Sequence, residues 1–160
     1  MDALSFWLAV LILLGSALIG GVFFIFSNTI MKSLAQRPAP EGMAAMQAIN
    51  VVIINPGFLG AFMGTAALSL LLVVVVLLGE TSLNRPLLIS GALAYFVGTF
   101  LVTVAGNVPL NNALEKADPN SPEGQAVWAD YLQRWTRLNT LRTVLAFVAS
   151  AFLLAALIAG

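Results

Sequence analysis

The chain has 160 residues, of which 60% are hydrophobic and 9% are charged, and its formal net charge is zero. A soluble domain is usually about 45–50% apolar and about 25% charged, so this composition indicates a protein whose solvent is a lipid bilayer. The neutral balance, without a block of Lys or Arg, excludes nucleic acid as a partner.

The chain contains neither cysteine nor histidine. This excludes disulfides and thiol nucleophiles, and it removes the commonest metal ligand and the commonest general base. The seven acidic residues lie outside the apolar segments and are not closely spaced. The sequence therefore predicts no metal site and no bound cofactor.

Four apolar segments are long enough to cross a bilayer, for which a helix needs about 20 residues. They cover residues 4–26, 58–78, 87–105 and 138–159. Lipid offers no partner for unpaired backbone groups, so each segment is predicted to be a helix. The predicted fold is all-α: a single integral membrane domain over residues 1–160, built as an up-down four-helix bundle with an extended third loop.

Glycine and proline positions refine this prediction. Residues 125–159 contain neither, so the fourth helix is predicted to be long and to project beyond the bilayer. The second helix is predicted to begin near Glu41 and to be kinked by Pro56 within it. Pro109 lacks an N–H, which predicts that the stretch AGNVPLNNAL at 105–114 ends the third helix and leaves carbonyls near Ala105 free to bind Arg142.

The charged residues of the loops predict an orientation. The first and third loops carry five Lys or Arg residues, whereas Arg85 is the one basic residue of the opposite side. By the positive-inside rule the first and third loops are cytoplasmic and both termini lie outside.

Uncharged amides gather at one end of the predicted bundle. The topology brings the end of the first span, the start of the second, the end of the third and the start of the fourth to one membrane face. The amides near these four ends are Asn28, Gln47, Asn50, Asn55, Asn107, Asn111, Asn112 and Asn139. The asymmetry predicts a polar chamber there; the alternative is that each Asn caps a helix or bridges two helices.

Arg142 and several aromatic residues belong to the same end. A charge inside a membrane segment indicates a functional site, and the alternative is a side chain that snorkels to the interface. Phe26, Phe58 and Trp135 provide the flat apolar walls that a small-molecule pocket needs. The alternative for the aromatic residues is an interfacial belt, in which Trp128 is the foremost candidate.

The stretches GGVFFIFSNTIMKSL, MQAINVVIINPGFLGAFMG, NVPLNNALEKADP and YLQRWTRLNTLRT together resemble the anthrone-oxygenase-like family of small membrane proteins. The resemblance covers most of the chain. It implies a four-helix membrane protein. Most members of the family are bacterial, so we expect this protein in a bacterial inner (plasma) membrane. The positions that match are Asn28, Gln47, Asn50, Asn55, Pro56, Asn107, Pro109, Asn111, Trp135, Asn139 and Arg142.

The resemblance also implies an activity, because members in fungal polyketide pathways oxidise anthrones to anthraquinones with molecular oxygen and without a recognised metal or flavin. For such an activity we predict catalytic roles for Arg142, Asn139, Asn107 and Asn111. We predict substrate binding by Asn28, Gln47, Asn50, Asn55, Phe26, Phe58 and Trp135. Family members often carry His where this chain has Thr140, so this chain lacks that potential base.

Two functions remain open from the sequence. One is cofactor-independent oxidation of a lipophilic phenol, anthrone or quinol, with membrane lipid and a lipophilic aromatic molecule as partners. The other is a non-catalytic membrane protein that binds a lipid or quinone, or docks a partner through its polar end.

Overall fold

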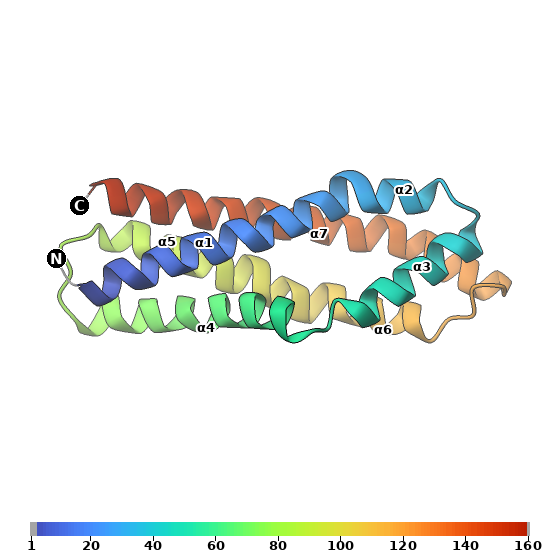
Figure 1. The fold of residues 1–160 in the computed structure, drawn as a ribbon, viewed down its shortest axis with the longest axis horizontal. Helices are drawn as coiled ribbons and strands as arrows, with labels where there is room; N and C mark the ends of the chain where they lie inside the picture. The colour runs from blue at the N-terminus through green and yellow to red at the C-terminus, as the bar shows by residue number, and fades with distance from the viewer. Residues whose placement is uncertain (1–2, 160) are drawn as a thin grey trace.

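The computed structural model describes residues 3–159, and within that range the chain forms an elongated helical bundle without a strand (Figure 1). Four helical segments are long and apolar enough to cross a membrane: Ala3–Ala35, Pro56–Leu78, Arg85–Glu115 and Pro122–Ala159. The predicted all-α membrane fold with four spans is confirmed. The start of the first span, the end of the last and the connection between the second and third lie at one end of the bundle (Figure 1).

The first span is one continuous rod made of α1 (Ala3–Ile25), a π-helical turn η1 (Phe26–Ile30) and α2 (Met31–Ala35). A short connection then leads to α3 (Ala39–Val52), which runs back along the bundle toward α4 (Pro56–Leu78). Helix α1 makes the most extensive pairing in the bundle with α7 (Pro122–Ala159), and α4 packs on α1 and on α5 (Arg85–Tyr95).

The prediction that Pro56 kinks a continuous second helix is wrong. The helix stops at Val52, and Pro56 is the first residue of α4. Asn55 adopts an extended conformation with φ −129° and ψ 158°, and its side chain accepts a hydrogen bond from the Phe58 N–H at 3.0 Å. Proline at the first position and asparagine at the N-cap are both favourable at a helix start, so the chain begins a new helix there.

The third span consists of α5 (Arg85–Tyr95), two π-helical segments η2 (Phe96–Leu101) and η3 (Thr103–Asn107), and α6 (Val108–Glu115). The prediction that AGNVPLNNAL ends this helix is therefore wrong.

The reason is a change of hydrogen-bond register. The N–H of Val108 bonds to the carbonyl of Thr103, five residues earlier, and Pro109 then falls in the first turn of α6. Residues in the first turn of a helix do not need a backbone N–H, which proline lacks, so the helical rod continues through Pro109.

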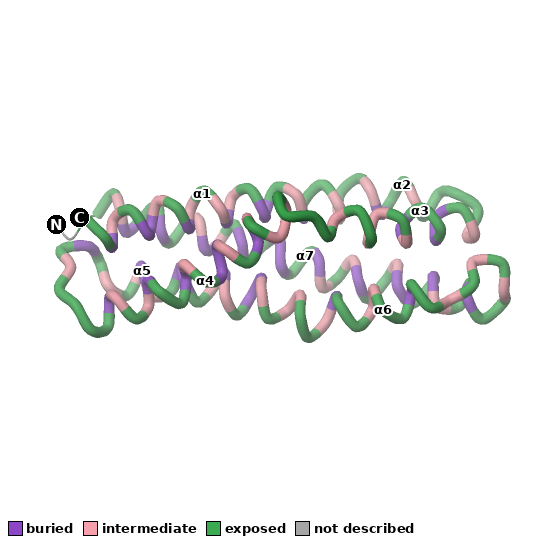
Figure 2. The backbone as a smooth tube through the Cα atoms, turned by 60° about the horizontal axis from the view of Figure 1, so that its bottom comes forward, coloured by how far each residue is buried: buried purple, intermediate pink, exposed green. Residues whose placement is uncertain are grey.

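Helix α7 (Pro122–Ala159) is continuous over 38 residues. At 1.5 Å per residue it is about 57 Å long, well beyond the roughly 30 Å hydrocarbon core of a bilayer. It begins where Ser121 Oγ accepts a hydrogen bond from the Gly124 N–H at 2.9 Å. The predicted long fourth helix is confirmed, and its buried residues follow its inner face (Figure 2).

The core divides along the long axis. Near the end that holds the α4–α5 connection, aliphatic residues such as Ile12, Leu72 and Leu153 pack together. Near the other end Met43, Met46, Leu114, Trp128, Tyr131 and Trp135 form a second core between α3, α6 and the first half of α7. Trp128 is 3% exposed in this second core, so the interpretation of Trp128 as part of an interfacial belt is wrong.

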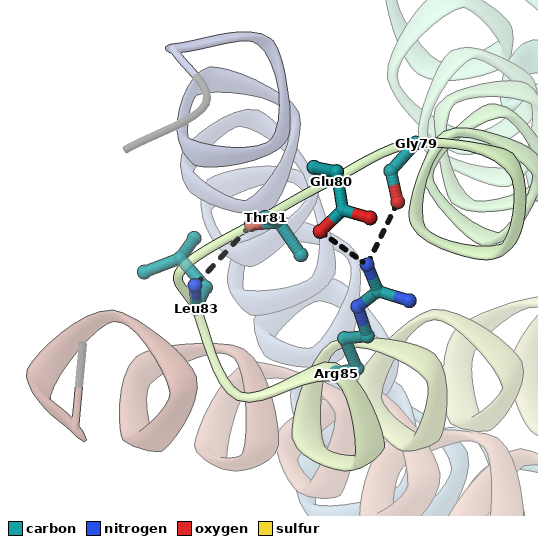
Figure 3. A network of polar contacts seen from close by, with 5 residues as sticks. All are labelled: Gly79, Glu80, Thr81, Leu83 and Arg85. Carbon is teal, nitrogen blue, oxygen red and sulfur yellow. Dashed lines mark hydrogen bonds and ion pairs between the residues drawn. The ribbon is translucent and has the colours of Figure 1, made fainter.

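The α4–α5 connection is held by local contacts (Figure 3). Arg85 Nη2 donates to the carbonyl of Gly79 at 2.8 Å and lies 3.4 Å from Glu80 Oε2. The N–H of Leu83 donates to Thr81 Oγ1 at 3.3 Å.

Candidate functional site

A pocket of about 620 Å³ lies where α3 ends and α4 begins. Its size falls within the range of about 300–1,000 Å³ that is usual for small-molecule sites. Most of its wall is apolar, with a few polar side chains among aliphatic and aromatic ones. The residues that line it are Val22, Phe23, Phe26, Met46, Ile49, Asn50, Val51, Ile53, Ile54, Phe58, Leu59, Phe62, Thr103, Val108, Asn111, Asn112, Glu115, Trp135 and Arg142.

Arg142 is the most unusual residue of the pocket wall. It is 4% exposed, which rules out the interpretation that it snorkels to the membrane surface. The salt bridges within residues 3–159 join Arg37 to Glu41, Arg85 to Glu80 and Arg134 to Asp130, so Arg142 has no acidic partner there. A buried cation is costly unless it is paired, and burying one beside a pocket favours an anionic ligand.

Neutral groups hold the guanidinium in place. Nη2 of Arg142 donates to Asn139 Oδ1 at 2.6 Å, and Nη1 donates to Thr103 Oγ1 at 2.9 Å. The predicted binding of Arg142 to carbonyls near Ala105 is wrong, because side-chain oxygens take that role. The guanidinium carbon lies 4.0 Å from the centre of the Phe23 ring, a cation–π contact. Nε of Arg142 is buried without a hydrogen-bond partner among residues 3–159.

Asn139 is itself fixed from the other side. Its Nδ2 donates to the carbonyl of Phe23 at 2.7 Å and to Ser27 Oγ at 2.6 Å. These bonds cross from α7 to the first span and determine which end of the amide faces Arg142. Asn139 is fully buried and does not line the pocket, so the structure places it as a support for Arg142.

Asn111 is oriented by two donors. Its Oδ1 accepts hydrogen bonds from Trp135 Nε1 at 2.7 Å and from the hydroxyl of Tyr131 at 2.9 Å. The amide NH₂ is therefore turned away from both and remains as a donor on the pocket wall. Asn50 Nδ2 lies 3.5 Å from the same Tyr131 hydroxyl, which links α3, α6 and α7 around one side of the pocket.

Aromatic rings form the other walls. Phe58 and Phe62 are stacked with centroids 5.9 Å apart and planes within 6°. Phe26 lies 5.9 Å from Trp135, centroid to centroid. These contacts place the predicted Phe26, Phe58 and Trp135 around one pocket, together with Phe23, which the sequence had not singled out as a ligand residue.

Five of the predicted site amides lie outside the pocket wall, and each has another place in the structure. Asn55 caps α4, and the exposed Asn28 accepts from Lys32 at 3.5 Å. Gln47 Nε2 donates to the carbonyls of Leu114 and Ala117, at 2.8 and 3.0 Å, where α6 ends.

Asn107 and Asn139 are the remaining two, and both are buried against α7. Asn107 Nδ2 donates to the Trp135 carbonyl at 3.2 Å. The alternative of capping or bridging describes four of these five amides, the exposed Asn28 being the exception, whereas Asn50, Asn111 and Asn112 line the pocket.

Thr103 and Glu115 line the pocket and were missed from the sequence, and Tyr131, which orients Asn111, was not predicted as a site residue. Thr103 follows from the π-helical segments, which no pattern of the third span indicated. Tyr131 could have been found, because it lies at helical spacing from Trp128 and Trp135 on the same face. Glu115 was overlooked because α6 was expected to be a loop.

Thr140 lies outside the pocket wall. Its hydroxyl is bonded to Ser27 Oγ at 3.0 Å and to the Thr136 carbonyl at 2.9 Å. Within residues 3–159 there is no group of three or more His, Cys, Asp or Glu side chains close enough to hold a metal ion.

Comparison with known proteins gives one match. The sequence model of the anthrone oxygenase family matches residues 58–152, which include α4, the third span and most of α7. No curated protein and no solved structure matches the chain.

Proposed function

The chain belongs to the anthrone oxygenase family, and we propose that it oxidises an anthrone, or a related lipophilic phenol or quinol, with molecular oxygen and without a metal or organic cofactor. The pocket binds the flat molecule, stabilises its anion and exposes it to oxygen, which partitions into the bilayer.

The chemistry needs little from the protein beyond binding and charge. Direct reaction of oxygen with a closed-shell molecule is spin-forbidden as a concerted step. An anthrone that has lost a proton is an electron-rich anion, which passes one electron to oxygen and then combines with the reduced oxygen as a peroxide. Loss of water from this peroxide gives the quinone, so one anthrone and one O₂ yield one anthraquinone and one water.

The burial of Arg142 beside the pocket is the single observation that carries this proposal. Its guanidinium is 4% exposed and has no acidic partner in the described chain, so the negative oxygen of a bound anion supplies the missing charge. A fixed cation in a site that excludes water stabilises a developing oxyanion far more than the same cation in water. Two neutral oxygens, from Thr103 and Asn139, hold it without neutralising it.

The other pocket residues fit a polycyclic substrate. Phe58 and Trp135 offer ring faces against which a flat molecule packs. Asn111 lines the pocket and its oxygen already accepts two bonds, so its NH₂ is the group that we expect to donate to a second substrate oxygen. A hydroxylated anthrone carries oxygens on more than one ring and satisfies both Arg142 and Asn111.

Non-catalytic binding of a quinone or lipid is the second candidate, and the aliphatic part of the wall favours it. Met46, Ile49, Ile53, Ile54 and Leu59 form a surface that suits an alkyl or prenyl tail. In this alternative Arg142 holds a quinone oxygen or a lipid head group, and no chemistry follows.

The test uses the purified protein in phospholipid vesicles supplied with anthrone under air. Formation of anthraquinone is followed by absorbance and O₂ consumption by an electrode, with protein-free vesicles of the same lipid as the control for spontaneous oxidation. We expect the protein to raise the rate well above this control, with one O₂ consumed for each anthraquinone formed.

One result would contradict the oxygenase proposal, and a second measurement then tests the binding alternative. A rate equal to that of the protein-free vesicles excludes turnover of this substrate. If anthraquinone nevertheless quenches Trp fluorescence saturably, because Trp135 is in the pocket wall, the binding alternative is supported.

A further inference from the structure

Glu115 is the acidic residue of the pocket wall. It is the last residue of α6 and lies one helical turn after Asn111, so both residues face the same side. It is exposed to water at the edge of the pocket, and none of the salt bridges within residues 3–159 involves it. The pocket therefore combines a buried cation and a free carboxylate that do not pair with each other.

Arg142 and Glu115 belong to helices that run in opposite directions, so we expect their side chains to lean toward each other. Side chains on a helix lean toward its N-terminus, and α6 and α7 run in opposite directions (Figure 1). Arg142 follows this rule, because its guanidinium bonds to Asn139 and lies 5.4 Å from the Trp135 ring. By the same rule we expect Glu115 to lean toward Asn111, which is bonded to Trp135.

The two charged residues lie on either side of the pocket residues Asn111 and Trp135. Along the axis, Glu115 is about 6 Å past Asn111, and Arg142 is about 10 Å past Trp135, at 1.5 Å per residue. The contact between Asn111 and Trp135 thus lies between the two charges. An anthrone carries its oxygen and its acidic CH₂ group on opposite edges of the middle ring, so one edge meets Arg142 while the other meets Glu115.

We propose that Glu115 is the catalytic base, an inference that rests on the proposed function. Its carboxylate takes a proton from the CH₂ of the middle ring. The electron pair of that C–H bond stays on the substrate, and its charge is delocalised to the oxygen held by Arg142. Glu115 then releases the proton to water at the exposed edge of the pocket and is ready for another substrate.

The other acidic residues near this end are less suited to the role of base, and so is Thr140, at the position where family members often carry His. Asp130 lines a separate, smaller cavity and is paired with Arg134 at 3.1 Å, and Glu41 is paired with Arg37 at 2.9 Å. Thr140 carries no base, and its hydroxyl is bonded outside the pocket.

The test separates proton removal from oxidation by excluding oxygen. Unsubstituted anthrone is added to the protein in vesicles under nitrogen, at a pH where free anthrone stays neutral. Its anion absorbs at longer wavelength, because the charge is spread over the three rings. The wild-type protein is compared with Glu115→Gln, which keeps the shape of the side chain, with Glu115→Asp, and with Glu123→Gln. Glu123 is an exposed Glu in the first turn of α7 that does not line the pocket, so it serves as the matched control.

We expect the anion band to rise rapidly with the wild type and with Glu123→Gln, and at least about 100-fold more slowly with Glu115→Gln, because a base that returns its proton to water changes the rate of ionisation and not its equilibrium. Under air, Glu115→Gln is expected to lower the rate of oxidation at least about 100-fold, the lower end of what a positioned base contributes. Raising the pH until the substrate ionises in solution should restore much of this rate, and Glu115→Asp should retain part of it.

An anion band that is absent from the wild type, or that rises equally fast with Glu115→Gln, overturns the assignment of Glu115. A band whose rate of appearance depends on Glu115 but that is not followed by oxidation under air supports the base and contradicts the oxygenase proposal. Oxidation that is equally fast in Glu115→Gln and Glu123→Gln leaves the oxygenase proposal standing and removes Glu115 from it.

Discussion

Each end of the bundle contains an arginine, and the two arginines differ in their exposure and in the groups that bind them. Arg85 has 41% of its side chain exposed, and it bonds to Gly79 and Glu80, six and five residues away. Arg142 is 4% exposed, and its bond to Thr103 spans 39 residues. A local ion pair at the surface closes a connection between helices. A buried cation held only by neutral groups, one of them from another span, provides a charge that a ligand can use.

The polar contacts follow the same division. At the Arg85 end the hydrogen bonds shown in Figure 3 join residues within one short connection. At the other end, side-chain amides bond to helical segments other than their own. These amides are Gln47, Asn107, Asn111 and Asn139. Side-chain amides therefore join the parts of the bundle there, and the pocket lies among them. Loss of a contact at this end should affect function and stability together.

The largest expected effect is that of Arg142→Gln compared with Arg85→Gln. Gln keeps a donor near Asn139 but removes the charge. We expect the rate of anthrone oxidation to fall about 100- to 1,000-fold, the effect of removing one oxyanion-stabilising group. Arg85→Gln, at the opposite end, should leave the rate unchanged.

Both variants are compared in vesicles at matched amounts of folded protein, judged by their elution as single species in detergent. A rate for Arg142→Gln within twofold of that for Arg85→Gln would mean that the buried charge has no role in the reaction.

The next largest effect concerns Asn139. Replacement by Ala removes the acceptor for Arg142 and leaves the Phe23 carbonyl without its donor. A buried group that loses its partner costs about 1–3 kcal/mol, and more where a charge is involved, so we expect unfolding to become easier by about 3 kcal/mol. The measurement is denaturant unfolding in detergent micelles.

Asn28→Ala is the control for Asn139→Ala. Asn28 is exposed at the same end, and its one side-chain contact is a 3.5 Å bond with Lys32. Surface substitutions of this kind usually change stability by less than about 0.5 kcal/mol. Equal effects of the two substitutions would show that burial of the Asn139 amide contributes little.

The sequence predicted the spans well because hydropathy and length are properties of single segments. The long α7 also followed from local information, the lack of Gly and Pro between residues 125 and 159. The helix boundaries at the two prolines were wrong because they depend on neighbouring turns. Pro56 begins a helix because Asn55 caps it, and Pro109 is accommodated by the π-helical η3.

The sequence predicted at which end of the bundle the candidate site lies, but it predicted only some of the residues that form it. Topology brings the amides together, but whether an amide faces a pocket or a neighbouring helix depends on rotation about each helix axis. Asn107 and Asn111 are one turn apart, and the first is buried against α7 while the second lines the pocket. Glu115 entered the site because α6 is a helix. The orientation of the bundle in the membrane stays a prediction from the loop charges.

A smaller effect, equal at the two ends, is expected at the helix caps. Asn55 accepts from the Phe58 N–H at 3.0 Å, and Asn84 accepts from the Leu87 N–H at 3.1 Å. Replacing either by Ala should lower stability by about 1 kcal/mol, the usual value of an N-cap. Thermal unfolding in detergent measures both.

The two caps differ in what else they position. Asn55 precedes Phe58 in the pocket wall, so Asn55→Ala should also weaken anthraquinone binding, measured by Trp fluorescence, whereas Asn84→Ala should not. Equal binding by the two variants would show that the start of α4 is held by packing alone.

The smallest effect is expected for Glu80→Gln. The Glu80 side chain is fully exposed, so its 3.4 Å contact with Arg85 is screened by water and salt, and such pairs contribute little. We expect no measurable change in Tm at any salt concentration. Arg85→Ala should lower Tm slightly, because the Gly79 carbonyl at the end of α4 loses its 2.8 Å donor. A clear, salt-dependent drop for Glu80→Gln would mean that the ion pair, and not the bond to the carbonyl, holds the connection. The contrast between Arg85, whose acidic partner contributes little, and Arg142, which has no acidic partner in the described chain, would then be smaller than the structure indicates.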